Sequence, residues 1–202
     1  MRRGRLHMPT PDLRVTLYRM AIRIALGYWI LLFLLSCSGP GQRRNDEDND
    51  RSCREFVQGF YDWYVPNAAK DNKEAGWDLA MKDRPNVFTA ELLQQLTADS
   101  QAQHKAADIV GLDFDPFLNC QDCGERYVVG NVTVTAAKCS TEVYGVWSGK
   151  KNDKPNVVPE LIGKDGKWLF VDFHYPNPSG PEFESLLRQL KTLRDLRENA
   201  PK

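Results

Sequence analysis

The sequence predicts an α+β domain of about 150 residues, with helices first, an antiparallel sheet next and one helix last. Three observations lead to this class. Apolar residues recur at helical spacing between 56 and 110, alternate with a period of two between 127 and 175, and return to helical spacing after 183. Helices that are separated in sequence from a run of antiparallel strands are typical of α+β proteins.

The first helix is expected to begin at Ser52. Ser52 and Glu55 have the spacing of a capping box, in which each side chain satisfies a free backbone amide. Aromatic residues then recur at helical spacing as far as Tyr64, and Pro66 is expected to end the helix. A short helical turn is predicted over 77–81.

A longer helix is expected to follow, with Thr89 as its N-cap and Gly111 closing it. Because the middle of its inner face is small or polar, this helix is expected to line a space and not a fully packed core. The residues of that face are Leu92, Leu93, Leu96, Ser100, Gln103, Ala107 and Val110.

Four strands are predicted after the helices. The first covers 127–134, with a break near Gly130 and Asn131, and the second covers 143–147. The third covers 157–162, where a proline indicates an edge strand or a bulge.

The fourth strand, 168–175, is expected to follow a tight hairpin turn at Asp165 and Gly166. A final amphipathic helix is predicted from leucines at helical spacing. The domain then covers 52–178, and 179–202 form the last helix and the tail. The apolar residues of the last helix are Phe183, Leu186, Leu187, Leu190, Leu193 and Leu196.

Three segments carry a family resemblance: FYDWY at 60–64, LDFDPF at 112–117 and VDFHYP at 171–176. They resemble an uncharacterised family of bacterial envelope proteins within the nuclear-transport-factor-two-like superfamily. The likeness covers 53–178. It implies a cone-like fold in which N-terminal helices pack on a curved, four-stranded antiparallel sheet, and it carries no established catalytic residues.

The N-terminal region predicts export. The uncharged apolar run 24–35 follows arginines and is shorter than the ~20 residues that cross a bilayer, which favours a signal peptide at 1–36. Met20 would start a signal of ordinary length. Residues 34–37 resemble a lipobox, in which Cys37 is acylated and becomes the new N-terminus.

Ser38 stands where an aspartate would retain a lipoprotein at the inner membrane, so the resemblance implies the outer membrane, facing the periplasm. The alternative is an ordinary signal peptide that releases a soluble periplasmic protein. Residues 39–51 contain no apolar side chain, and we expect a flexible tether there, with Cys37 and the tether spanning 37–51.

The charge of the chain argues against a nucleic-acid partner. The full sequence has 27 basic and 27 acidic residues. Six arginines and one aspartate precede Cys37, so the exported part keeps 21 basic and 26 acidic residues, a net charge of −5. Nucleic-acid binding usually needs a clustered basic face, which this mild acidity does not indicate.

Four further cysteines suggest disulfides in an oxidising compartment, and the sequence leaves all three pairings open. A CxxC motif could instead be redox-active or half of a zinc site. No strand-to-helix pattern surrounds it and no second ligand pair has zinc spacing, so we expect structural bridges, no metal and no cofactor. The four residues are Cys53, Cys120, Cys123 and Cys139.

Asp172 and His174 are the candidate catalytic pair. In a regular strand they share a face with Trp168 and Phe170, so the aspartate could orient the imidazole as a general base. The resemblance to the superfamily implies this possibility, because its ketosteroid isomerases and dehydratases use aspartate or histidine inside the cone. The structural alternative is that both side chains bind the loop beyond Pro176.

Aromatic and acidic residues are candidates for a ligand pocket, although aromatics at regular spacing more often fill a core. The acidic loop could hold calcium through Asp113, Asp115, Asn119 and Asp122, but its spacing is not that of an EF-hand, and turn capping explains these residues more simply. The pocket candidates are Tyr64, Trp77, Trp168, Asp113 and Asp115.

Together these features predict a lipid-anchored, periplasm-facing binding or interaction module that is not an enzyme. Its partners would be outer-membrane lipid, through the anchor, and an envelope protein or an apolar ligand. One alternative is a cone-fold enzyme that acts on a small hydrophobic substrate through Asp172 and His174. Another is an inhibitor or immunity protein.

Overall fold

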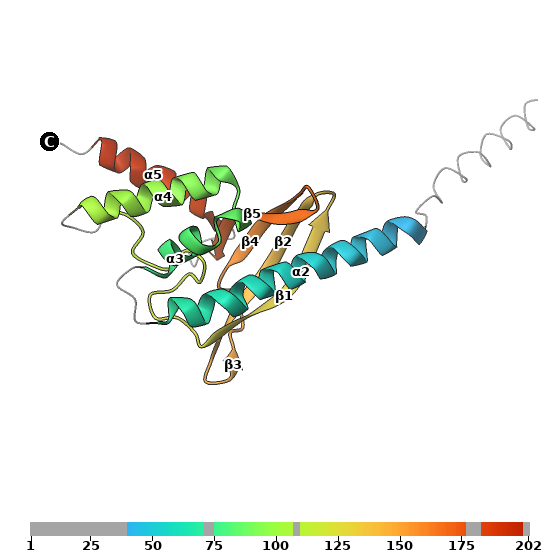
Figure 1. The fold of residues 1–202 in the computed structure, drawn as a ribbon. Helices are drawn as coiled ribbons and strands as arrows, with labels where there is room; N and C mark the ends of the chain where they lie inside the picture. The colour runs from blue at the N-terminus through green and yellow to red at the C-terminus, as the bar shows by residue number, and fades with distance from the viewer. Residues whose placement is uncertain (1–39, 71–74, 107–109, 177–182, 200–202) are drawn as a thin grey trace, which may run out of the picture. The chain divides into compact units, whose positions relative to one another are not determined.

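The computed structural model describes residues 40–70, 75–106, 110–176 and 183–199 (Figure 1). Residues from Asp46 onward form one compact unit. The predicted signal peptide 1–36, with Met20 and Cys37, lies outside the described residues. Among the helices described, none combines the length and the apolarity that crossing a bilayer requires.

Helix α2 spans Pro40–Ala68, so the expected flexible tether is helical from Pro40 onward. The predicted capping box is wrong, because Ser52 lies within this helix and donates its hydroxyl to the carbonyl of Asn49 at 3.0 Å. Extending an existing helix avoids the cost of a new nucleus, so a polar stretch can continue an amphipathic one. Pro66 lies inside α2, two residues before its end.

Helices α3 (Gly76–Asp83) and α4 (Ala90–Lys105) follow, with a 3₁₀ turn η1 (Pro85–Val87) between them. The structure confirms the N-cap of α4, since Thr89 Oγ1 accepts from the amide of Leu92. Helix α4 ends at Lys105 and not at Gly111.

The inner face of α4 does not line an empty space, because a buried polar contact occupies it. Asp99 is buried, and its carboxylate accepts from Arg197 of α5 (Leu186–Glu198) at 2.6 Å. Asp99 also accepts from the amide of Leu112 at 2.9 Å. A β-carbon at Gly111 would stand 2.7 Å from this carboxylate, so a larger residue there would displace it.

The predicted α+β class is confirmed, with an antiparallel sheet of six strands instead of four. The order of the sheet is β1-β2-β4-β5-β6, with β3 paired to β2. The two strands that the sequence did not predict, β3 and β6, are the shortest. The strands are β1 Arg126–Thr135, β2 Lys138–Trp147, β3 Lys150–Lys151, β4 Val158–Lys164, β5 Lys167–Pro176 and β6 Phe183–Ser185.

Two irregularities in the sheet agree with the sequence. The register of β1 shifts between Val129 and Val132, as the predicted break requires. The register of β4 shifts just after Glu160, next to Pro159; because β4 lies between β2 and β5, the proline marks a bulge and not an edge.

The second bulge changes the faces of β5. Glu160 pairs with Asp172 while its neighbour Leu161 pairs with Phe170, so Val171 is left unpaired. Phe170 and Phe173 therefore both enter the core, with ring centroids 5.0 Å apart. The predicted shared face of Trp168 and Phe170 with the candidate pair 172/174 is wrong, since strict alternation fails at a bulge.

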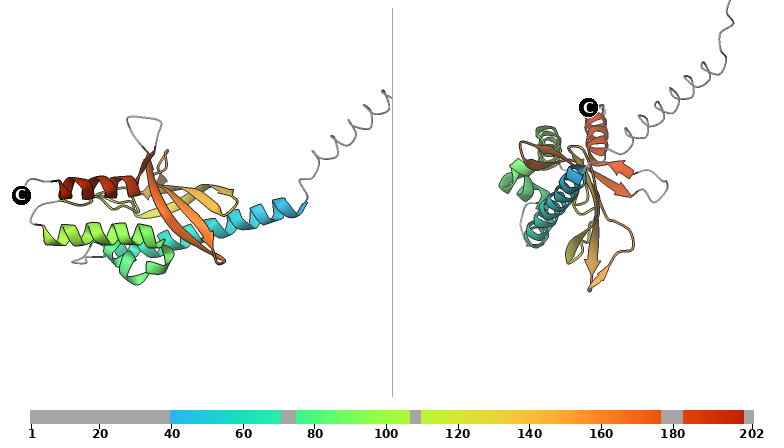
Figure 2. Two further views of the ribbon diagram at one scale, coloured as in Figure 1. Left: turned by 90° about the horizontal axis from the view of Figure 1, so that it is seen from above. Right: turned by 90° about the vertical axis from the view of Figure 1, so that its right-hand side faces the viewer.

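Helix α2 packs across one face of the sheet, as the views of Figures 1 and 2 show. The contact is aromatic: the Phe170 ring of β5 lies 4.9 Å from that of Phe60 and 5.4 Å from that of Phe56, both in α2. A disulfide between Cys53 and Cys139 ties α2 to β2. This packing fixes the end of α2, against which the candidate site forms.

Candidate functional site

The candidate site is a cavity of about 590 Å³ between the end of α2, the start of α3 and the loop 112–124. We call it the Trp77 cavity, and the loop the Asp115 loop. Three of the five predicted pocket residues line it: Trp77, Asp113 and Asp115. The full lining is Val65, Ala68, Ala69, Trp77, Asp113, Phe114, Asp115, Leu118, Cys120, Gln121, Cys123 and Gly124.

Asp115 organises the loop that forms one wall of the cavity. Its Oδ2 accepts from the Tyr64 hydroxyl at 2.6 Å, and its Oδ1 accepts from the amides of Phe117 at 2.9 Å and Leu118 at 3.1 Å. The two amide contacts are those of an Asx-type turn. Tyr64, the fourth predicted pocket residue, thus lies directly behind the lining and is itself buried.

Burial raises the pKa of Asp115 to about 6, and the hydrogen bonds from Tyr64, Phe117 and Leu118 oppose that rise. Burial likewise raises the pKa of Tyr64 well above its usual value, and the negative charge of Asp115 raises it further. The pair at neutral pH is therefore a carboxylate that accepts from a neutral phenol.

Other buried tyrosines anchor the same loop to the core. The hydroxyl of Tyr61 donates to the Phe117 carbonyl at 2.9 Å, and that of Tyr175 donates to the Pro116 carbonyl at 2.8 Å. These contacts reach the loop from α2 and from β5, so the wall of the cavity is held from two sides. Such preorganisation lowers the entropy cost of binding.

The Cys120–Cys123 disulfide closes the end of the Asp115 loop. The amide of Asp115 donates to the Cys120 carbonyl at 2.9 Å, and the Gln121 side-chain amide donates to the Asp113 carbonyl at 3.1 Å. Predicted structural bridges are therefore present, and the structure gives the pairing that the sequence left open.

A second cavity, of about 450 Å³, lies on the other side of the same loop. It shares Asp113 and Phe114 with the Trp77 cavity, and α5 and β6 supply its other wall. Its lining mixes apolar side chains with charges of both signs. The lining is Gly111, Leu112, Asp113, Phe114, Phe183, Glu184, Ser185, Arg188, Gln189, Thr192 and Leu193.

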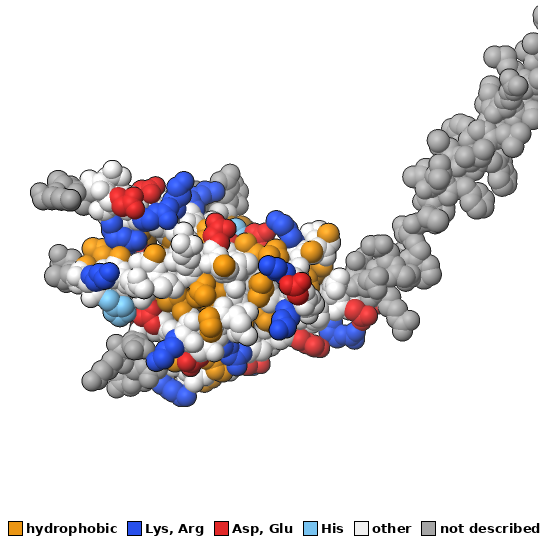
Figure 3. All heavy atoms as spheres, turned by 45° about the horizontal axis from the view of Figure 1, so that its top comes forward, with side chains coloured by type: hydrophobic (Ala, Val, Ile, Leu, Met, Phe, Trp, Pro, Cys, Tyr) orange, Lys and Arg blue, Asp and Glu red, His pale blue; other side chains and the backbone are white. Residues whose placement is uncertain are grey.

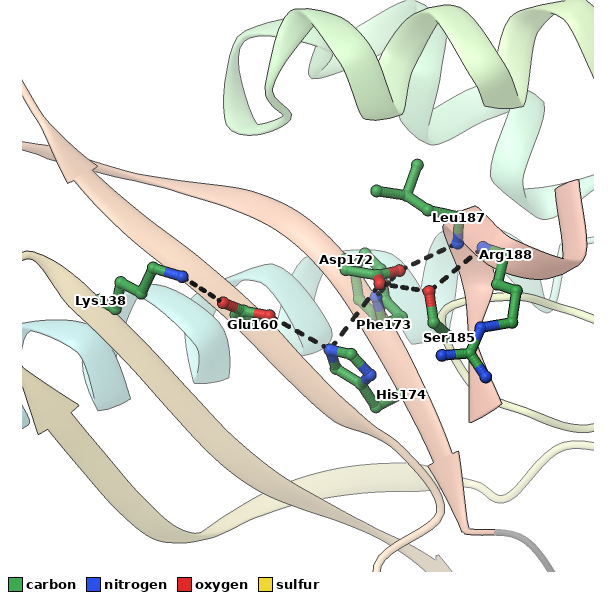
Figure 4. A network of polar contacts seen from close by, with 8 residues as sticks. All are labelled: Lys138, Glu160, Asp172, Phe173, His174, Ser185, Leu187 and Arg188. Atoms are coloured by element: carbon green, nitrogen blue, oxygen red, sulfur yellow. Dashed lines mark hydrogen bonds and ion pairs between the residues drawn. The ribbon is translucent and has the colours of Figure 1, made fainter. Parts of the chain in front are cut away.

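The predicted catalytic pair lies elsewhere, in the polar network of Figure 4. Asp172 Oδ1 accepts from the amide of Leu187 at 3.1 Å, and Oδ2 accepts from the Ser185 hydroxyl at 2.5 Å. Ser185 is the N-cap of α5 and accepts from the amide of Arg188. Asp172 therefore holds the start of α5, which is close to the structural alternative that the sequence suggested.

His174 joins a row of charges across the strands. Its Nε2 lies 3.3 Å from Glu160 Oε2 and 3.8 Å from Asp172 Oδ2, and Lys138 Nζ lies 3.2 Å from Glu160 Oε1. Burial raises the pKa of Glu160, but the hydrogen bonds and charges of His174 and Lys138 outweigh it, so the pKa is lowered.

This row lies on the face of β5 opposite the core, because its neighbours in the strand, Phe173 and Tyr175, are buried. A cavity of about 240 Å³ borders His174 and Glu160 there. The structure thus brings Asp172 and His174 together, as predicted, but outside the aromatic interior.

No protein-family model, no curated protein and no solved structure matches this chain.

Trp168, the last predicted pocket residue, does not line the Trp77 cavity. Its indole Nε1 donates to the hydroxyl of Ser52, in the middle of α2, at 3.0 Å. Among the described residues, no three histidine, cysteine or acidic side chains converge as a metal would require. The carboxylate of Asp115, a calcium candidate from the sequence, accepts hydrogen bonds from the amides of its own loop and from Tyr64.

Sequence reasoning missed several lining residues. Ala68 and Ala69 lie where α2 ends, and Leu118 and Gln121 come from the Asp115 loop. The available signal was the pair of small residues just after Pro66, a place where a helix end leaves room for a neighbour. The cysteines of the CxxC motif were expected to be structural, and nothing in their spacing indicated that they also line a cavity.

Proposed function

We propose that this protein is a lipid-anchored binding module of the bacterial envelope that faces the periplasm and is not an enzyme. The observation that carries the proposal is the Trp77 cavity, whose volume of about 590 Å³ falls within the ~300–1,000 Å³ of typical ligand sites. Its lining combines apolar side chains with the polar groups of Asp113, Asp115 and Gln121 on a loop anchored by tyrosines, an arrangement suited to binding.

The absence of catalysis is supported by how the candidate groups are used. Both oxygens of Asp172 accept hydrogen bonds at the start of α5, and both oxygens of Asp115 accept hydrogen bonds in its loop. A general base needs a lone pair directed at substrate, together with a partner that stabilises developing charge. Each carboxylate instead has a structural role.

The envelope location is supported by the sequence before the domain. The run 24–35 and the lipobox-like residues ending in Cys37 favour export and acylation, and Ser38 favours the outer membrane. Two disulfides suit an oxidising compartment such as the periplasm. A soluble periplasmic form remains the alternative proposal.

We also propose that the domain has the cone-like arrangement of the nuclear-transport-factor-two-like superfamily. The supporting features are four long antiparallel strands, two bulges that bend them, and the aromatic packing of α2 on one face. The Trp77 cavity would then lie where the helices meet the end of the cone.

Site-specific photocrosslinking tests the proposed function. A photoreactive amino acid replaces Gln121, an exposed lining residue, and in a matched control it replaces Lys167, exposed on the turn into β5. In cells irradiated with the anchor intact, we expect a defined adduct at 121 and none at 167. The mass of the adduct distinguishes a small apolar ligand from an envelope protein. No adduct at 121 contradicts the proposal.

One observation favours an enzyme as the second candidate. His174 Nε2 lies 3.8 Å from Asp172 Oδ2 beside a cavity of about 240 Å³. A small hydrophobic substrate there would meet an imidazole that a carboxylate orients. If a His174→Ala strain keeps the phenotype of the wild type while deletion of the gene alters it, this candidate fails.

A further inference from the structure

We propose that the Trp77 cavity recognises an organic cation, that is, an ammonium or guanidinium group carried on an apolar stem. The inference rests on the proposed function, because it names the ligand class of the same cavity. It combines three properties of the lining: the sign of its charges, the lack of a cation that neutralises them, and its aromatic and aliphatic walls.

The charged side chains that line the Trp77 cavity are all acidic among the described residues. They are Asp113 and Asp115, and no lysine, arginine or histidine belongs to the described lining. By contrast, charges of both signs are interspersed over the face of the molecule in Figure 3. The single sign of the lining therefore favours a positively charged group.

Neither carboxylate is paired with a cation in the described part of the chain. All three hydrogen bonds to the carboxylate of Asp115 come from donors that stabilise its anionic form. Lys70, which follows the end of α2, donates to Asn67 and does not line the cavity. A ligand that brings a positive charge would supply the missing partner.

The negative potential extends through the surrounding tyrosines. After burial, which is the main cause, the charge of Asp115 adds to the raised pKa of each of four tyrosines. Asp78, next to Trp77 in α3, raises the pKa of Tyr64 as well, and its own partner is His104 of α4 at 3.2 Å. The four tyrosines are Tyr61, Tyr64, Tyr127 and Tyr175.

The walls suit the stem that carries the cation. Trp77 provides an indole, the best of the aromatic rings for a cation–π contact, and Phe114, Val65 and Leu118 provide apolar surface. The second cavity is a useful contrast. It includes Arg188 with Asp113 and Glu184, so its lining does not favour one sign of ligand.

Such a cation could belong to a small amine or to a basic side chain of a peptide, because both present a positively charged nitrogen group on an apolar stem. Calorimetric titration of the full chain, exported and purified from a bacterial host, tests it with three matched probes. These are 2-phenylethylammonium, 2-phenylethanol and 3-phenylpropanoate. A short acetylated and amidated peptide with one lysine, beside its acetyl-lysine form, distinguishes the two sources.

The expected result is an affinity for the ammonium at least about tenfold above that for the alcohol, and no binding of the carboxylate. Asp113→Asn and Asp115→Asn should each weaken ammonium binding by about three- to tenfold and leave alcohol binding unchanged. Asp165→Asn, in the turn before β5, is the matched control and should change neither. Asp113 is exposed, so its variant tests the site without a risk to folding.

Equal affinities for the ammonium and the alcohol, or ammonium binding that both lining variants leave intact, would overturn the cation inference. If an adduct still forms at position 121, the proposed binding function survives that result. If no probe binds and no adduct forms at 121, both proposals fail. Tighter binding of the lysine peptide than of the free amine assigns the cation to a partner protein.

Discussion

At the scale of single residues, Asp115 combines two properties that are usually separate. It is an acceptor that shapes a loop, and it is a carboxylate whose burial raises its pKa to about 6. The hydrogen bonds from Tyr64, Phe117 and Leu118 limit this rise but do not cancel it. The loop therefore includes a charge whose energetic cost depends on pH.

The first prediction concerns that cost. Because the folded pKa of Asp115 exceeds its ordinary value of 3.8, the folded state binds the proton more tightly, and this group lowers stability as pH rises from about 4 to 6. The contribution is of the order of 3 kcal/mol. Urea denaturation at pH 4, 5, 6 and 7 should show the stability of the wild type falling by about this amount relative to that of Asp115→Asn, because groups such as Glu160 titrate alike in both proteins. Parallel pH profiles for the two proteins would contradict the assignment.

The second prediction separates the two members of the candidate catalytic pair. Asp172→Ala removes an acceptor for Leu187 and Ser185 at the start of α5, and we expect a loss of about 1–3 kcal/mol in the free energy of unfolding. His174→Ala, on the half-exposed row with Glu160, should cost less than about 1 kcal/mol. Urea midpoints measure both. Equal losses would show that Asp172 has no special role at α5.

The proximity of Asp172 and His174 could be predicted from their i, i+2 spacing, but their direction could not. A bulge shifts β5 by one residue and turns both away from the core. Pro159 predicted an irregularity in the third strand, β4, but the residue that loses its partner is Val171 in the neighbouring strand β5. The sequence of β5 alone does not reveal the bulge, because which residue of β5 lacks a partner depends on how β5 pairs with β4.

At the scale of elements, the sequence predicted the kinds of helices and strands better than their ends. Thr89 was found because an N-cap has a local chemical signature. The start of α2 was predicted wrongly because Ser52 and Glu55 have the spacing of a capping box, although both residues lie inside the helix. Strand β6 was missed because its three residues are stabilised by pairing with β5 and not by a pattern of their own.

The third prediction concerns the two disulfides, which differ in the length of chain that each closes. The Cys53–Cys139 bond closes a chain separation of 86 residues, and the Cys120–Cys123 bond closes a separation of 3. On the chain-entropy model, loss of the first costs about 4–5 kcal/mol and loss of the second about 2 kcal/mol. Double Cys→Ser variants of each pair, compared by urea denaturation, measure the difference.

If the short disulfide proves as costly to remove as the long one, the entropic account is insufficient. The Asp115 loop would then depend on that bond for its folded conformation. In that case the Cys120→Ser/Cys123→Ser variant should also lose the photocrosslinked adduct at Gln121, whereas the Cys53→Ser/Cys139→Ser variant should retain it wherever it remains folded.

At the scale of the whole molecule, the domain and the predicted membrane address lie in separate parts of the chain. The domain depends on an aromatic core that periodicity predicted, and the cavity depends on a loop that only the folded chain assembles. Trp77 and Asp115 are 38 positions apart in sequence and meet because Tyr64 fixes the loop against α2. The periodicity of apolar residues carries no information about which distant residues, such as Trp77 and Asp115, line the same cavity.

The last prediction concerns that address. Two or three acyl chains on Cys37 should hold the protein at a membrane stably, because one chain alone gives only marginal binding. Metabolic labelling with a palmitate analogue should therefore mark the wild type and not Cys37→Ser. Ser38→Ala is the matched control and should be labelled like the wild type, whereas Ser38→Asp should be labelled but move to the inner-membrane fraction. A wild-type protein that stays unlabelled and fractionates with the cytosol would remove the anchor, and with it the proposal that the Trp77 cavity works at the envelope.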